Sequence, residues 1–274
     1  MHFIEVNGTG LRYELTGADN SADNGGDNGA RTVVLIHEMG GSLESWDGVA
    51  ALLAARRRVL RYDTRGAGMA EKVRGAVSID TMVDDLAQLL DTIGNSGKVA
   101  LAGIAVGGAI ALHAAVRLGT ARVSAVVAGS PATGIAAERR AAVMARVDRI
   151  EREGMRIAVD ESMANGYPPQ LRTDAARFAA FRARWLGNDP ASYAAIYRML
   201  VEMDLQPELP HIACPVLVLG GSLDRTRPPA LVEPVARAIP GARYQLLETS
   251  HYMAVATPEL IAAAIDGFLD SISA

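Results

Sequence analysis

The chain has 274 residues, of which 50% are hydrophobic, a formal net charge of −4 and an isoelectric point near 5.8. A weakly acidic chain without a basic cluster argues against a nucleic-acid partner. No apolar run reaches the roughly 18 residues that a membrane-spanning helix needs, so we expect no membrane partner either. The length fits one α/β domain with an insertion.

The beginning of the chain and its cysteine content predict a cytoplasmic protein. Residues 1–6 lack the basic and apolar regions of a secretory signal. The one cysteine, Cys214, excludes an internal disulfide and fits a reducing compartment. Because Cys214 directly precedes an apolar strand, we expect it to pack rather than to react. The sequence is compatible with a homodimer.

The first half of the chain alternates between strands and helices. Two strands near 2–6 and 11–16 flank a turn at Asn7–Gly10. The polar, glycine-rich residues 17–30 predict a flexible surface loop. Their Asn and Asp spacing lacks the closing glutamate of a calcium-binding loop. This alternation predicts a parallel sheet covered by helices on both faces. The elements expected next are strand 31–37, helix 43–55, strand 57–63, helix 79–93, strand 98–104, helix 106–118 and strand 122–129.

Residues 134–208 carry helical patterns only, and we interpret them as a cap inserted into a core formed by 1–133 and 209–274. Such a cap would cover the carboxyl ends of the strands, where open α/β sheets bind ligands. The core then resumes with strand 215–221, helix 230–239 and strand 243–247. The four cap helices are expected at 139–152, 154–164, 173–185 and 192–203.

The segment Gly103–Gly108 joins a predicted strand to a predicted helix by a sharp turn. This strand–turn–helix pattern is typical of a nucleophile elbow, which normally reads Gly-x-Ser-x-Gly. The flanking glycines fit a strained central residue that leaves no room for side chains two positions away. Here the central residue is Ala105, which has no nucleophilic atom.

An acid and a base follow later strands in the order that this chemistry requires. Asp224 comes after strand 215–221, and His251 comes after strand 243–247. In a working triad the histidine takes a proton from the nucleophile, and the aspartate fixes its tautomer. Asp224 and His251 are therefore the candidate acid and base.

Together these motifs resemble the α/β-hydrolase superfamily, most closely small lidded esterases and lactonases similar to 3-oxoadipate enol-lactonase. The resemblance implies an α/β-hydrolase fold with a catalytic triad, and hydrolysis of a small ester or lactone. It places the oxyanion hole at the backbone N–H groups of Met39 and Val106. His37 would brace the oxyanion loop, and Arg65 would form a structural ion pair.

The expected substrate-binding residues come from the loops and the cap. The family usually has His-Gly where this chain has His37-Glu38, so we expect Glu38 either in a surface or salt-bridged position or in a role in substrate choice. Tyr193 and Tyr197 share one helical face with Leu200, which predicts either pocket lining or ordinary packing. The full set is Glu38, Ser130, Trp185, Tyr193, Tyr197 and Tyr252.

Three hypotheses explain Ala105. The first is an engineered Ser→Ala change that inactivates a hydrolase, because alanine deletes only the hydroxyl. The second is a cofactor-free lyase, oxygenase or carbon–carbon hydrolase that uses His251 and Asp224 as a general base. The third is a small-molecule binding protein, which would have no physical reason to keep the acid–base pair. We find no metal-binding or dinucleotide motif and expect no cofactor.

Overall fold

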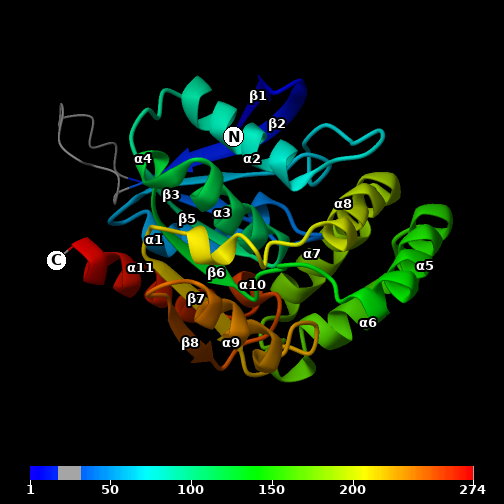
Figure 1. The fold of residues 1–274 in the computed structure, drawn as a ribbon. Helices are drawn as coiled ribbons and strands as arrows, with labels where there is room; N and C mark the ends of the chain where they lie inside the picture. The colour runs from blue at the N-terminus through cyan, green and yellow to red at the C-terminus, as the bar shows by residue number, and fades with distance from the viewer. Residues whose placement is uncertain (18–31, 274) are drawn as a thin grey trace.

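A computed structural model describes residues 1–17 and 32–273. An eight-stranded sheet forms the centre of this part of the chain, with helices on both sides (Figure 1). Apart from Gly17, the flexible loop predicted for 17–30 lies outside the described residues. The strands are β1 (His2–Val6), β2 (Thr9–Thr16), β3 (Thr32–Ile36), β4 (Arg58–Tyr62), β5 (Val99–Ile104), β6 (Val123–Gly129), β7 (Val216–Gly221) and β8 (Arg243–Leu247).

The predicted helices are confirmed, with bounds that shift by a few residues. The helix expected from residue 43 begins with a 3₁₀ turn, η2 (Leu43–Trp46), and two further 3₁₀ turns are η3 (Pro169–Leu171) and η4 (Leu209–His211). The α-helices are α1 (Asp47–Leu53), α2 (Ile79–Thr92), α3 (Val106–Arg117), α4 (Gly119–Arg122), α5 (Ala137–Glu153), α6 (Arg156–Gly166), α7 (Ala175–Leu186), α8 (Pro190–Glu202), α9 (Pro229–Ala238), α10 (Met253–Ala256) and α11 (Pro258–Ser273).

The strand order is β1-β2-β4-β3-β5-β6-β7-β8. The hairpin of β1 and β2 turns through Asn7 and Gly8, both with positive φ (48° and 69°), as a two-residue turn of the primed type requires. β2 is antiparallel to β4, whereas β3 to β8 pair in parallel. The carboxyl ends of β3 to β8 therefore lie at one edge of the sheet, and the loops that follow them meet there.

Alternate side chains of each central strand enter two different cores, as expected for a sheet buried on both faces. In β3, Val34 and Ile36 pack with α2, α3 and α9, whereas Val33 and Leu35 pack with α1 and α11. The parallel sheet covered on both faces is thus confirmed, and its strands have little freedom to slip in register.

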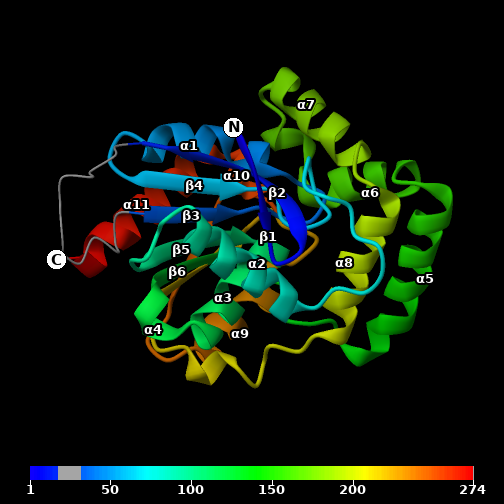
Figure 2. The same ribbon diagram turned by 90° about the horizontal axis from the view of Figure 1, so that it is seen from above.

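The helices α5 to α8 form an insertion between β6 and β7, and both views place them together to one side of the sheet (Figures 1 and 2). The two ends of the insertion lie next to each other, because the Leu205 N–H donates to the Thr133 carbonyl (3.0 Å) and Gly134 forms a bridge with Asp204. A third hydrophobic cluster joins the insertion to α10 and Tyr252.

The first turn of α3 lies directly on the backbone of neighbouring strands. A Cβ atom on Gly107 would come within 2.1 Å of the Ile36 carbonyl oxygen, and a Cβ atom on Gly103 within 2.1 Å of the Gly107 carbonyl oxygen. The flanking glycines are therefore required by close backbone approach, at their own positions rather than against the central residue.

We predict that Gly107→Ala lowers the free energy of unfolding by roughly 3 kcal/mol, because the new methyl group must push α3 away from β3. Urea denaturation measures the change. Gly267→Ala in α11 is the matched control, since nothing lies within 4 Å of its Cβ position and alanine stabilises a helix by about 0.5–1 kcal/mol. Equal effects of the two changes would contradict the close approach.

Candidate active site

Ala105 occupies a strained turn between β5 and α3. Its backbone has φ 53° and ψ −111°, one of three non-glycine residues with positive φ in the described chain. The turn is held on both sides, since the Ala105 N–H donates to the Gly129 carbonyl (2.9 Å) and its carbonyl accepts from the N–H groups of Ala109 and Ala132 (both 3.0 Å). Strain maintained by surrounding bonds is typical of functional sites.

Asp224 and His251 are joined by a hydrogen bond of 2.9 Å between Oδ2 and Nδ1. The other carboxylate oxygen of Asp224 accepts from the backbone N–H groups of Thr226 and Arg227, both at 2.8 Å. Burial raises the pKa of Asp224, but His251, the Arg227 N–H and the Ser130 hydroxyl outweigh burial and hold the pKa below its usual value. An ionised Asp224 only accepts, so Nδ1 of His251 donates this bond and Nε2 is the ring nitrogen left for a substrate.

The two loops that carry this pair are tied to each other. The Leu223 N–H donates to the Thr249 carbonyl (2.9 Å), and the Ser222 N–H donates to the Leu247 carbonyl (2.9 Å). Asp224 and His251 are both buried, at 3% and 7% exposure. The geometry therefore provides an imidazole held in one orientation at the carboxyl edge of the sheet, where Ala105 also lies.

His37 braces the loop after β3. Its Nε2 accepts a hydrogen bond from the Thr64 N–H (3.1 Å), so its Nδ1 is the donor, to the Glu38 carbonyl (2.7 Å). Both ring nitrogens are thereby used, which confirms a bracing position and leaves neither for proton transfer. Arg65 likewise pairs with Asp85, at 2.6 and 2.8 Å, as expected of a structural residue.

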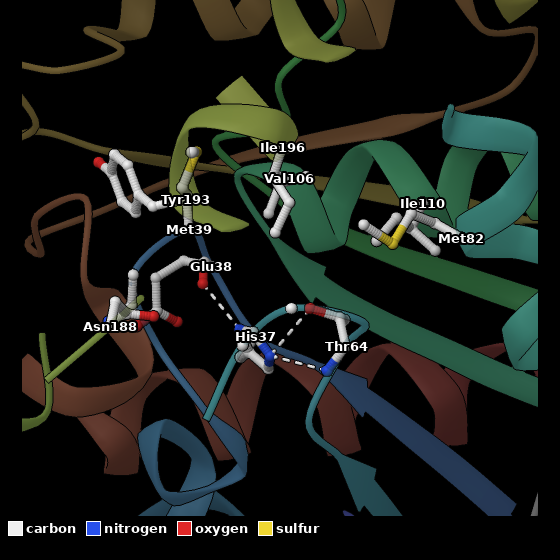
Figure 3. Close-up of a pocket in the computed structure, with 13 residues that line it drawn as sticks. His37, Glu38, Met39, Thr64, Met82, Val106, Ile110, Asn188, Tyr193 and Ile196 are labelled. Carbon is white, nitrogen blue, oxygen red and sulfur yellow. Dashed lines mark hydrogen bonds between the residues drawn. The ribbon is translucent and has the colours of Figure 1, made fainter. Parts of the chain in front are cut away.

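A pocket lies beside this loop and the first turn of α3 (Figure 3). Met39 and Val106, the predicted oxyanion donors, both line it. Within the described part of the chain the Met39 N–H bonds no acceptor, and the Val106 N–H belongs to the unsatisfied first turn of a helix. Such donors suit a developing negative charge. The remaining lining residues are His37, Glu38, Gly40, Thr64, Gly66, Ala67, Met82, Ile110, Asn188, Tyr193 and Ile196.

The structure contradicts the expectation that Glu38 is at the surface or in a salt bridge. Glu38 is 1% exposed, and its Oε1 accepts from the Ser45 hydroxyl (2.8 Å). Neutral Ser45 satisfies one carboxylate oxygen without placing a cation beside it. Among the described residues, Oε2 of Glu38 has no hydrogen-bond partner.

The predicted aromatic residues have different environments. Tyr193 lines the pocket and packs on Trp185, with ring centroids 5.6 Å apart, while the Tyr252 ring lies 5.6 Å from that of His251. Trp185 is fully buried, and Tyr197 packs on Tyr193 at 5.8 Å without lining the pocket. Only Tyr193 of these four is thus a lining residue.

Ser130, the remaining predicted residue, follows β6 in a second strained turn with φ 40°. It is fully buried, and its N–H donates to the Leu219 carbonyl (2.8 Å). Its hydroxyl lies close enough to Asp224 to help lower the pKa of that carboxyl. Ser130 belongs to the same sheet edge as Ala105 but does not line the pocket.

The insertion contacts the loops of the core at this edge. Gly166 of α6 is so close to Tyr252 that a Cβ atom would lie 2.5 Å from its ring, and the Tyr252 N–H donates to the Gly166 carbonyl (3.1 Å). Asn188 donates to the Gly40 carbonyl (2.9 Å), and Ser192 accepts from the Val73 N–H (2.9 Å). The insertion is therefore placed to form a wall of the site.

Several lining residues were not anticipated from the sequence. Met82 comes from α2, Ile110 from α3, and Ile196 from α8, so the pocket is built from elements far apart in the chain. Asn188 lies two residues after α7, and a polar residue just past a helix end was the one local signal that could have marked it.

A buried ion network fixes the loops after β3 and β4. Asp63 accepts from Arg12 (2.7 and 3.1 Å) and from the N–H groups of Leu43 (2.8 Å) and Met69 (2.7 Å). Arg12 also donates twice to Glu44, both at 2.7 Å. Burial opposes ionisation of Glu44, but hydrogen bonds from Arg12 and Ser42 prevail and lower its pKa to about 2.

We predict that Glu44 makes the fold more sensitive to acid. Its pKa is about 2 in the folded chain and 4.5 as the ordinary value, so its contribution is complete above pH 4.5 and disappears as the pH falls toward 2. The contribution is at most about 3 kcal/mol. The free energy of unfolding of Glu44→Gln should therefore fall less than that of the parent chain between these pH values. Parallel curves would contradict the bond to Arg12.

Within residues 1–17 and 32–273, no group of three His, Cys, Asp or Glu side chains is arranged to hold a metal ion. Across the same residues, no helix has both the length and the apolar character needed to cross a membrane. Cys214 is buried, as expected, and burial raises the pKa of its thiol to about 11.

The sheet, the strained turn and the acid–base pair define an α/β-hydrolase. The family described as serine aminopeptidase S33 matches residues 27–252, and the chain belongs to this family. It is 25% identical to 3-oxoadipate enol-lactonase 1 of Acinetobacter baylyi, over 97% of this chain and 95% of the relative. It is 30% identical to a putative non-heme bromoperoxidase of Mycobacterium tuberculosis, over 88% and 95% of the two chains.

Solved structures agree with this assignment. A thermophilic esterase from Thermogutta terrifontis superposes with a TM-score of 0.89 at 25% identity, covering 99% of both chains. The enol-lactonase from Burkholderia xenovorans LB400 superposes with a TM-score of 0.88 at 28% identity, covering 98% of this chain and all of the other. The chain is therefore a homologue of esterases and lactonases, and the α/β-hydrolase fold expected from the sequence is confirmed.

Proposed function

We propose that this chain acts on a small ester or lactone by general-base catalysis from His251, without a covalent intermediate at position 105. The observation that carries the proposal is the hydrogen bond between His251 and Asp224 at the sheet edge that also carries Ala105, a residue with no nucleophilic atom. Asp224 fixes the tautomer in which Nε2 is free to accept a proton. Whether Ala105 arose by design or in nature, no acyl group can form on its side chain.

The proposed reaction gives each of these groups one role. The substrate carbonyl oxygen would lie between the N–H groups of Met39 and Val106. Nε2 of His251 takes a proton from water, the resulting hydroxide attacks the carbonyl carbon, and negative charge develops on the carbonyl oxygen. The protonated imidazole then returns the proton to the departing alkoxide. The products are a carboxylic acid, which carries the hydroxyl group of the water, and an alcohol, which carries its proton.

A second function uses the same base on a carbon acid. Nε2 of His251 would remove a proton beside the carbonyl, and the same two N–H groups would stabilise the enolate. The methyl group of Ala105 favours this alternative, because it removes the nucleophile that would compete for the carbonyl. Reaction in ¹⁸O-labelled water separates the two functions, since only hydrolysis places ¹⁸O in the acid product.

We predict that Asp224→Asn lowers kcat of the unmodified chain by roughly 10⁴-fold, because the amide no longer enforces the tautomer of His251. Steady-state kinetics on an ester and lactone panel measures the effect. Asp160→Asn is the control, since the Asp160 side chain is 86% exposed on α6. Unchanged turnover in Asp224→Asn would remove the base from the mechanism, and a panel without any turnover would favour the binding protein.

We predict that Ala105→Ser raises the turnover of activated short-chain esters by roughly 10⁴-fold, because a hydroxyl group is the one element of a triad that the chain lacks. Stopped-flow measurement of the released alcohol should also show an initial burst. Adding His251→Ala to Ala105→Ser should abolish the gain. A serine variant that stays inert while the unmodified chain turns over a substrate would show that the site never held a nucleophile there.

A further inference from the structure

Glu38 has an environment that is unusual for a glutamate. It stands in the loop between β3 and η2, immediately before Met39, and it is 1% exposed. The Ser45 hydroxyl satisfies Oε1, and a Cβ atom on Gly41 would lie only 2.4 Å from that oxygen. The carboxylate is therefore held from one side by its own loop.

The second carboxyl oxygen of Glu38, Oε2, lacks a hydrogen-bond partner in the part of the chain that the structure describes. Within the described chain, Oε2 is buried without a hydrogen-bond donor, and no Lys, Arg or His forms a salt bridge with Glu38. Leaving a polar oxygen buried and unsatisfied costs about 1–3 kcal/mol. A fold that retains such a group has an acceptor available for a partner from outside the chain.

The position of Glu38 relates this acceptor to the reaction site. Glu38 and Met39 line the same pocket, and Figure 3 shows both in its wall. Burial and the Glu38 carboxylate raise the pKa of Tyr252, whose ring lies 5.6 Å from that of His251. The carboxylate therefore adjoins the predicted oxyanion donor in the chain and lies close enough to the neighbour of the base to raise its pKa.

From these contacts we infer that Glu38 selects substrates that carry a hydrogen-bond donor, a hydroxyl or amino group, near the reacting carbonyl. The inference rests on the proposed function, because it assigns the substrate class of the same site. The donor hydrogen would bond Oε2, while Ser45 keeps Oε1 in place. A substrate with a carboxylate at that position would be repelled by the like charge.

Binding to the unmodified chain tests the inference without any need for turnover. The probes are γ-butyrolactone, its α-hydroxy, β-hydroxy and α-amino derivatives, and a γ-butyrolactone carboxylate, each titrated by calorimetry. We expect the best donor-bearing lactone to bind about 10–100-fold tighter than γ-butyrolactone. The carboxylate derivative should bind more weakly than γ-butyrolactone. The hydroxy and amino compounds distinguish the two kinds of donor.

Glu38→Gln supplies the decisive comparison. The amide oxygen can still accept from Ser45, but the NH₂ group that replaces Oε2 cannot accept, so the preference for donor-bearing lactones should fall to within about 3-fold of parity. The variant should resist urea about as well as the parent chain, because the amide keeps the bond from Ser45 and exchanges one unpartnered buried polar group for another. Glu138→Gln, at an exposed position in the first turn of α5, is the control and should keep the preference.

Two results would overturn this role of Glu38: donor-bearing lactones that bind no better than γ-butyrolactone, or a preference that persists in Glu38→Gln. These results are distinct from failure of the proposed function. If Asp224→Asn leaves turnover unchanged, the base role falls whatever Glu38 does, and if the preference persists in Glu38→Gln, the base role can still stand.

Discussion

The close packing of the first turn of α3 on the end of β3 is the constraint on which the site depends. Gly107 brings the helix so near the Ile36 carbonyl that a methyl group has no room. That approach sets Val106 beside the loop that carries Met39, and Ala105, directly before Val106, adopts a positive φ. Two potential donors thus share one pocket because two backbones touch.

Around this contact, buried polar groups either hold the loops or remain open toward a ligand. Asp63 and His37 have their bonding capacity used by neighbouring loops, so they fix geometry. Both carboxylate oxygens of Asp224 likewise accept hydrogen bonds, and the bond to Nδ1 leaves Nε2 of His251 for a substrate. Glu38 alone among these five retains an unsatisfied buried oxygen. This contrast is the physical basis for separating structural from reactive groups.

Much of this arrangement follows from the sequence, because some constraints are local. The glycine spacing around Ala105 predicts the strained turn. The alternation of strands and helices predicts parallel strands, and parallel pairing of β7 and β8 places Asp224 and His251, which follow them, at the same edge of the sheet. The burial of Glu38 could not be predicted, since it depends on how its loop folds back onto Ser45. The contribution of Ile196 likewise depends on how the insertion packs.

The central claim is that the chain catalyses without a covalent acyl intermediate, and intact-protein mass spectrometry tests it most directly. The chain is incubated with a slow, activated ester, quenched with acid, and compared with Ala105→Ser. The account predicts an acyl adduct that maps to position 105 in the serine variant, and turnover without an adduct in the unmodified chain. An acyl adduct on another residue of the unmodified chain, such as Glu38 or Ser130, would contradict it.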